Sequence, residues 1–160
     1  MRRAAAALVG AVALSVLGAA PVGAAAPPIT HAVGAATPAT APFPDLTQAT
    51  VHLGGRALLV VIAQTEAERE AGLRRRSTLG PYRGMLFVFP NDSRIGFTMS
   101  TVPVALDIGF YGAHGRPVGR LRMRPCPRPE ADCPVYEAGR PFRYAVETLG
   151  GQLPRGPLTS

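Results

Sequence analysis

The sequence predicts a mostly β protein, a compact antiparallel sandwich or barrel-like domain with one short helix near residues 66–71. One observation behind this prediction is the run Gly84–Phe89, which is too apolar for a surface loop and ends at Pro90. The other is that further short apolar runs follow, each bounded by Gly or Pro, as in antiparallel sheets. Both faces of the strand expected in this run, residues 85–89, are apolar, which predicts a central position in the sheet. Strands are expected at residues 85–89, 94–99, 104–111, 116–124 and 142–149.

Residues 51–63 predict a hairpin, because two apolar stretches flank the two-residue turn Gly54-Gly55. The expected helix follows directly. Thr65 and Glu68 have the spacing of a capping box, in which the threonine oxygen accepts from a free helical amide and the glutamate reaches back. Gly72 is placed to end this helix.

The chain divides into three regions by composition. Residues 1–24 are expected to be a signal peptide, because Arg2-Arg3 precede an uncharged, alanine-rich run and small residues precede the cleavage site. An uncleaved membrane anchor is the alternative, although glycine and proline make the run weakly hydrophobic for a span. Residues 25–46, rich in Pro, Ala and Thr, are expected to be a disordered linker. Residues 47–160 are expected to form the single β-rich domain, secreted or held in the cell envelope.

The charge of the chain is positive, and all 17 of its basic residues are arginine. This bias is typical of a GC-rich genome, so the arginine count alone assigns no role. Without Arg2 and Arg3, 15 arginines face 10 acids, which leaves a net charge of +5. Such a charge favours anionic surfaces. Nucleic acid is not expected as a partner, because aromatic residues do not interleave the arginines and the chain is expected to be exported.

Several motifs resemble one protein family in their order along the chain. They are Gly72-Leu73, Arg76, Leu79, Gly84–Pro90, Phe97-x-Met99, Leu106-Asp107-Ile108-x-Phe110, Pro125-Cys126, Cys133-Pro134-x-Tyr136 and Tyr144–Glu147. Together they resemble the domain of unknown function 192 family over roughly residues 51–151. The resemblance implies a compact, mostly β domain that is often exported and has no established activity. This chain departs from the family pattern at Arg74 (usually Met), Thr98 (Trp), Thr101-Val102 (Asn-Thr) and Ala105 (Pro).

Asp107 is the single carboxylate inside the second apolar run, Leu106–Phe110. A period of two places it on one face with Ala105 and Gly109, whose small size leaves space for a ligand or for an arginine. A buried carboxylate needs a partner or shifts its pKa. Arg76, which matches the family motif, is the first choice of partner. A binding site and a structural salt bridge both remain open.

Glu147 is the second carboxylate in an apolar strand. Asp107 and Glu147 would suit a hydrolase or lyase if their carboxyl groups lay about 5 to 9 Å apart. No Gly-x-Ser-x-Gly motif occurs, and the cysteines and histidines lack the spacing of a zinc site. We therefore expect no metal and no cofactor.

Arg120, Arg122 and Arg124 alternate with apolar residues and would share one face of a strand. Gly112–Gly115 is expected to be the hairpin turn before that strand. The arginines could bind an anionic cell-envelope polymer or simply form a solvated face.

Cys126 and Cys133 are the only cysteines, and in an exported chain they predict a disulfide bond. Closing a loop of about eight residues stabilises by roughly 2.5 kcal/mol. A redox role would favour the shorter Cys-x-x-Cys spacing, so the bond is expected to be structural.

The sequence thus predicts a small exported β domain, a non-catalytic binding or accessory module for a small ligand or an anionic polymer. The binding residues would be Asp107, Arg76 and the three arginines of the 120–124 segment. An envelope hydrolase or lyase and a purely structural domain without a pocket are the alternatives.

Overall fold

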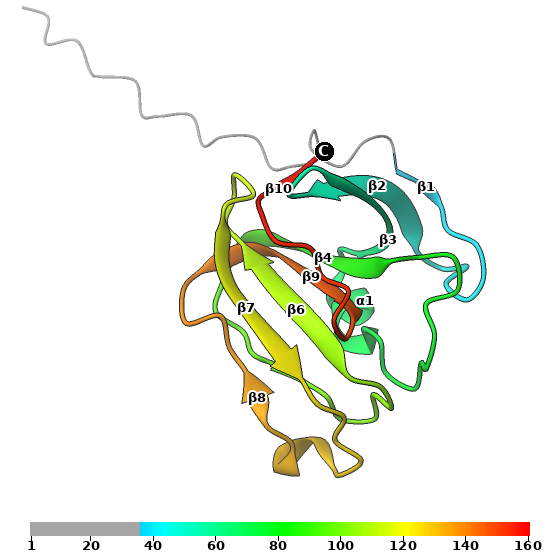
Figure 1. Ribbon diagram of the computed structural model, residues 1–160. Coiled ribbons are helices and arrows are strands. Elements are labelled where there is room, and N and C mark those ends of the chain that lie inside the picture. The colour runs from blue at the N-terminus through cyan, green and yellow to red at the C-terminus, as the bar shows by residue number, and fades with distance from the viewer. Residues whose placement is uncertain (1–35) are drawn as a thin grey trace, which may run out of the picture.

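The computed structural model describes residues 36–160, which form one curved sheet with a small two-stranded sheet beside it (Figure 1). The expected signal peptide, residues 1–24, and the first part of the expected linker lie outside the described residues. The elements are β1 (Thr37–Pro38), β2 (Thr47–Leu53), β3 (Arg56–Ala63), α1 (Glu66–Ala71), β4 (Gly84–Ser93), β5 (Phe97–Thr98), β6 (Leu106–Tyr111), β7 (Pro117–Met123), the 3-10 turn η2 (Glu130–Asp132), β8 (Val135–Tyr136), β9 (Phe142–Leu149) and β10 (Leu158–Thr159).

The main sheet has eight strands in the order β1-β2-β3-β4-β9-β6-β7, and β10 also pairs with β2. Its neighbouring strands are antiparallel except β3 and β4, which are parallel because α1 and the segment after it carry the chain back. Among the described strands, β7 pairs with neither β1 nor β2, so the curved sheet does not close. The predicted mostly β, barrel-like fold is therefore confirmed, in an open form.

The C-terminal segment, residues 150–160, bridges two distant parts of the curved sheet. β10 pairs with β2, and the N–H of Leu158 donates to the carbonyl of Gly115 in the β6–β7 turn (2.8 Å). A Cβ atom on Gly115 would overlap the Leu158 carbonyl, so this approach requires glycine. Leu153 and Leu158 are buried. The proline-rich tail is thus an integral part of the fold.

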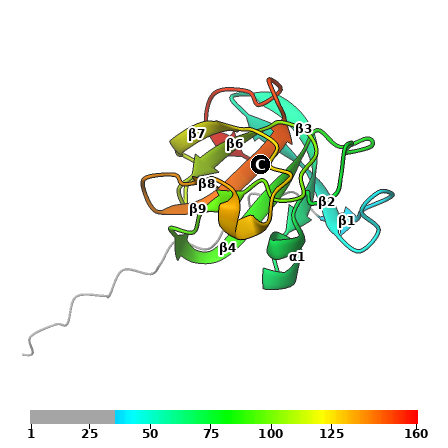
Figure 2. The ribbon, with the colours of Figure 1, turned by 90° about the horizontal axis from the view of Figure 1, so that it is seen from below.

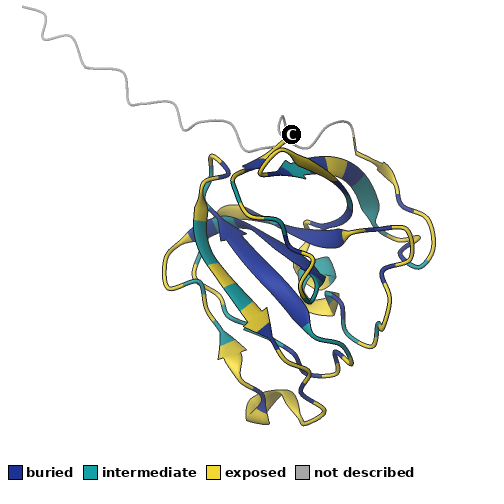
Figure 3. Ribbon diagram, viewed as in Figure 1, coloured by how far each residue is buried: buried dark blue, intermediate teal, exposed yellow. Residues whose placement is uncertain are grey.

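The middle strands of the sheet are buried on both faces, as the run of dark blue in Figure 3 shows. Phe87 of β4 packs with Leu73, which follows α1, on what we call the helix-side face. Leu86 packs with Leu153 on the opposite face, which we call the C-terminal face. The central position predicted for residues 85–89 is confirmed, since β4 lies between β3 and β9.

Residues 36–46, expected to belong to a disordered linker, are folded against the domain. β1 pairs with β2, and Phe43 is buried with its ring edge-on to Tyr82, 5.8 Å between centroids. The N–H of Thr40 donates to the Tyr82 hydroxyl (2.7 Å). The folded unit therefore starts before the expected boundary. The sequence did not indicate this because the few apolar residues of the segment follow no strand or helix period.

Helix α1 begins and ends where the sequence predicts. The Thr65 side chain accepts from the N–H of Glu68, the Glu68 carboxylate accepts from the N–H of Thr65, and Gly72 caps the end at φ 45°. None of its six residues is buried, so its caps and the buried Leu73 hold it beside the sheet, as seen from below in Figure 2. No helix of residues 36–160 has the length and hydrophobicity needed to cross a bilayer.

Candidate functional site

Asp107 lies in β6 on the C-terminal face and is 4 % exposed. Its Oδ2 accepts from the N–H of Gly151 (2.7 Å) and lies 3.6 Å from the Arg120 guanidinium, while Oδ1 lies 3.9 Å from that of Arg122. The carboxylate is therefore fully partnered. Its role in the fold is to hold the C-terminal segment against β6 and β7.

Arg76 is not the partner of Asp107, so that predicted pairing is wrong. Its Nη1 donates to the carbonyl of Pro42 (2.8 Å), and its guanidinium lies over the Phe43 ring, 4.2 Å from the centroid. The physical reason is that the loop carrying Arg76 packs on residues 36–46, the segment expected to be disordered. Arg76 thus fastens the N-terminal segment to the domain.

The space expected beside Asp107 is filled. A Cβ atom on Gly109 would lie 2.6 Å from the Tyr111 hydroxyl and 3.1 Å from the Leu153 side chain. These two side chains occupy the volume that the small residue leaves. Gly109 therefore leaves no open space on this face for a ligand.

Asp107 and Glu147 point to opposite faces of the sheet. Asp107 is paired with Thr148 and Glu147 with Ile108 in the β6–β9 register, and residues directly opposite each other share a face. The two carboxylates are therefore separated by the sheet itself. They cannot act together as the acid and base of a hydrolase.

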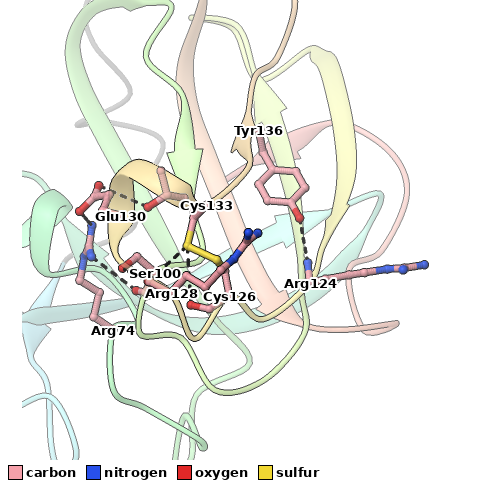
Figure 4. Close-up of a disulfide and its surroundings, with 9 residues drawn as sticks. Arg74, Ser100, Arg124, Cys126, Arg128, Glu130, Cys133 and Tyr136 are labelled. Carbon is pink, nitrogen blue, oxygen red and sulfur yellow. Dashed lines mark hydrogen bonds and ion pairs between the residues drawn. A yellow bond between two sulfur atoms is a disulfide. The ribbon is translucent and has the colours of Figure 1, made fainter.

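The arginine series is not a free basic ladder. Arg120 and Arg122 share the face of Asp107, and Arg120 also donates to the carbonyl of Pro154 (3.2 Å). Arg124 follows the end of β7, and its backbone N–H donates to the Tyr136 hydroxyl (3.1 Å), with its side chain extended away (Figure 4). Two of the three predicted binding arginines thus neutralise a buried acid.

A cleft of about 700 Å³ opens on the helix-side face. It is lined by α1 and the residues after it, by β4 and β5, by η2 and by the end of β9. These segments are far apart in sequence. Sequence reasoning missed the cleft for that reason.

Glu147 is a buried residue in the lining of this cleft. It belongs to β9, is 4 % exposed, and has Met85 and Ile108 as its cross-strand neighbours. Among the residues that the structure describes, none donates a hydrogen bond to its carboxyl group or forms an ion pair with it. Burial raises the pKa of Glu147 to about 8.

Aromatic rings form the walls beside Glu147. Phe87 lies diagonally across the β4–β9 ladder from Glu147, and Phe97 of β5 packs edge-on against it, 5.2 Å between centroids. Phe89 lies further along β4, and the guanidinium of Arg69 covers its ring at 4.9 Å. Thr98, at the position where the family resemblance implied tryptophan, also lines the cleft.

Charged residues surround the mouth of the cleft. Glu66 and Glu70 lie one turn apart on the exposed helix, and Glu130 belongs to η2. Two arginines also line the cleft, and both are occupied elsewhere. Arg69 donates to the carbonyl of Val88 (3.0 Å), and Arg74 pairs with Glu130 (2.8 Å).

The disulfide between Cys126 and Cys133 is present, which confirms the predicted bond. It closes the loop that carries η2 and Glu130 (Figure 4). Glu130 accepts from the Thr98 hydroxyl (3.3 Å) and from Arg74, so the loop is tied to both β5 and the end of α1. The disulfide therefore helps to position one wall of the cleft.

Metal coordination receives no support from the geometry. Within residues 36–160 no three His, Cys, Asp or Glu side chains come together in a way that could hold a metal ion. The sequence indicates Glu147 as an acid in an apolar strand, but the acid pair that it suggests with Asp107 does not form, because the two side chains lie on opposite faces of the sheet.

Comparisons with known proteins place the fold. The model of the DUF192 family, "Uncharacterized ACR", matches residues 49–158. A crystal structure of a protein of unknown function from Novosphingobium aromaticivorans is similar, with 28 % identity, a TM-score of 0.59 and coverage of 73 % of this chain and 84 % of that chain. A structure of a putative transcription regulator from Sinorhizobium meliloti has 24 % identity, a TM-score of 0.56 and coverage of 68 % and 88 %, and it shows likeness of fold alone. No curated protein matches the chain.

Proposed function

Because the chain belongs to the DUF192 family of uncharacterised proteins, its function has to be argued from its own cleft, and we propose that it is a non-catalytic small-ligand-binding module that works outside the cytoplasm. The ligand enters the cleft between α1, β4 and β5. Its polar group meets Glu147, and its apolar part contacts the phenylalanine walls.

One observation carries this proposal. Glu147 is 4 % exposed, has no partner among the described residues, and lines a cleft of about 700 Å³, a volume in the usual range for small-molecule sites. A buried polar group without a partner is unfavourable for the fold. A ligand that pairs with the carboxyl group would supply the partner that the fold does not provide.

Binding is favoured over catalysis by the composition of the cleft. Of the titratable residues that line it in residues 36–160, Glu147 alone is buried. Asp107, the expected second acid, lies on the opposite face. The cleft therefore holds no paired buried acids of the kind that glycoside hydrolysis requires.

Two features support a location outside the cytoplasm. Arg2-Arg3 with the apolar run that follows has the pattern of a secretory leader. The disulfide requires an oxidising compartment to persist. An anionic polymer as partner has weaker support, because Arg120 and Arg122 face Asp107.

A fragment screen by protein NMR tests the binding proposal. Neutral, cationic and anionic aromatic fragments are added in turn, and amide shifts are followed at Gly72 and Gly96, which line the cleft, and at Gly55 in the β2–β3 turn. We expect shifts at the first two and not at the third. If no fragment perturbs the cleft amides up to its solubility limit, the proposal is wrong.

Fractionation of intact cells tests the location. The protein should be found outside the cytoplasm with Cys126 and Cys133 oxidised. Cytoplasmic protein with two free thiols would contradict the proposal.

A further inference from the structure

We infer that the cleft binds a small organic cation, a molecule with an ammonium group on an apolar body, and that the ammonium pairs with the carboxylate of Glu147. This inference rests on the proposed binding function and names the ligand class of the same cleft. The supporting observations are the charge of the lining, the missing partner of Glu147, and the aromatic walls.

The lining of the cleft has the opposite charge to the chain. The whole chain carries a formal charge of +7, yet the residues around the cleft include four glutamates and two arginines. The glutamates are Glu66, Glu70, Glu130 and Glu147. In a protein with an excess of arginine, an acidic cavity attracts cations and repels anions.

The two arginines of the lining do not supply the missing charge. Arg74 makes three interactions away from Glu147: with the carbonyl of Glu70 (3.1 Å), with that of Ser100 (3.4 Å) and with the Glu130 carboxylate (2.8 Å). Arg69 lies over Phe89 and donates to the backbone of β4. Neither arginine of the lining therefore pairs with Glu147, so its carboxyl group can pair with a cation that enters the cleft.

The aromatic walls favour the same ligand. Phe87 and Phe97 present ring surfaces within the cleft, and a ring face attracts a nearby cation. Arg69 above Phe89 shows that one wall already holds a cation in this way. Rings and aliphatic side chains also accept the apolar body of the ligand.

The mouth of the cleft continues this apolar surface. Ile95 and Val135 are large apolar residues that are 50 % and 58 % exposed. Ile95 lines the cleft, and Val135 contacts Gly96, which lines it too. The apolar body can therefore extend from Glu147 towards the surface.

The charge state of Glu147 makes the inference measurable. Burial raises the pKa of Glu147 to about 8, so at lower pH its carboxyl group must release a proton to pair with a cation. Affinity for an ammonium ligand should then rise about tenfold per pH unit up to about pH 8 and level off above it. A neutral ligand that accepts a hydrogen bond from the protonated carboxyl group would instead lose affinity as the pH rises above about 8.

Other groups near Glu147 do not reproduce this pattern. The charged residues that line the cleft are Glu66, Arg69 and Glu70 of α1, Arg74 after it, and Glu130 of η2. β4 and β6 place only Met85 and Ile108 directly opposite Glu147. Among the titratable residues that line the cleft in residues 36–160, Glu147 is the one that is buried.

Three probes of nearly equal shape test the ligand class: 2-phenylethylamine, 2-phenylethanol and phenylacetate. Each is titrated into the protein between about pH 6 and pH 9, and Kd is read from the amide shifts of Gly72 and Gly96. At about pH 8 the amine should bind at least about tenfold more tightly than the alcohol, and phenylacetate most weakly. The amine alone should show the rise with pH.

Glu147→Gln keeps the shape of the side chain and removes its charge. We expect the variant to lose the preference for the amine and its pH dependence while keeping its affinity for the alcohol. Asp45→Asn is the matched control, because Asp45 is exposed and does not line the cleft. It should behave as the wild type.

The outcomes separate the two proposals. Equal affinity of amine and alcohol at Gly72 and Gly96 would overturn the cation inference and leave the binding function standing. Binding of the amine that persists in Glu147→Gln would also overturn the inference. If none of the three probes shifts the cleft amides, the cation inference is wrong, and the fragment screen alone then decides the binding function.

Discussion

Replacing Glu147 by glutamine also isolates the energetic effect of the buried acid in the absence of any ligand. Burial raises the pKa of Glu147 from 4.5 to about 8. Because the folded chain holds this proton more tightly than the unfolded chain, the free energy of unfolding falls as the pH rises from about 4.5 to about 8. Below that window the carboxyl group is neutral in both states, and above it the loss is constant.

The magnitude follows from the two pKa values. One unit of pKa difference corresponds to about 1.4 kcal/mol. Between about pH 5 and pH 7, the two titrations give the wild type a loss of about 2 to 3 kcal/mol from Glu147. Glutamine does not titrate, so Glu147→Gln should gain about 2 to 3 kcal/mol on the wild type over this range. For a domain of this size the difference shifts Tm by on the order of 10 °C.

Urea unfolding followed by circular dichroism measures this difference at several pH values. Every other titratable group is common to the two proteins, so its contribution cancels in the comparison. Asp45→Asn, an exposed control, should keep the wild-type pH dependence. Parallel stability curves for the wild type and Glu147→Gln would refute the reasoning, because Glu147 would then not be an uncompensated buried acid.

Three further predictions concern parts of the fold that position the cleft or complete the domain. Replacing Cys126 and Cys133 by serine should lower the free energy of unfolding by about 2.5 kcal/mol, because the loop is no longer closed, and unchanged urea unfolding would contradict this. Asp107→Asn should cost about 1 to 3 kcal/mol and speed hydrogen exchange at the Gly151 amide, because the carboxylate holds that N–H; exchange at the wild-type rate would argue against the contact. Phe43→Ala should cost about 3 to 5 kcal/mol, because the ring is buried; a loss below about 1 kcal/mol in urea unfolding would place the segment outside the core.

Features with a local cause were predictable from the sequence. The capping box of Thr65 and Glu68, the end of α1 at Gly72 and the buried strand β4 each depend on residues a few positions apart. The disulfide was predictable because only one pairing of two cysteines exists. These features form as predicted because no distant contact competes with the local interactions that cause them.

The partner of Asp107 was also within reach of the sequence. The sequence predicts a hairpin turn at Gly112–Gly115, and counting outward from it brings Asp107 opposite Arg120, one of its two arginine partners. The observed register, which contains an irregularity between Phe110 and Tyr111, places Arg122 opposite Asp107. The family motif drew attention to Arg76 instead. A register counted from a turn is here a better guide than a shared motif.

The cleft could not be predicted in the same way. Its walls come from α1, β4, β5, η2 and β9, and no local pattern sets how these segments meet. Phe43 and the other apolar residues of segment 36–46 are spaced without a period, so their burial is likewise a result of tertiary contacts alone. The one cleft residue that the sequence does indicate is Glu147, an acid in an apolar strand.

The two buried acids differ in partners and not in exposure, and this contrast points to the functional one. Asp107 and Glu147 are each 4 % exposed. Asp107 accepts from Gly151 and faces two arginines, whereas no described residue pairs with Glu147. They lie in adjacent strands, one residue out of register, so the period of two sends one carboxylate into the fold and the other into the cleft. Asp107 thus has three partners, whereas the equally buried Glu147 has none among the described residues and lies beside a cavity, and this difference is why the proposed ligand is placed at Glu147.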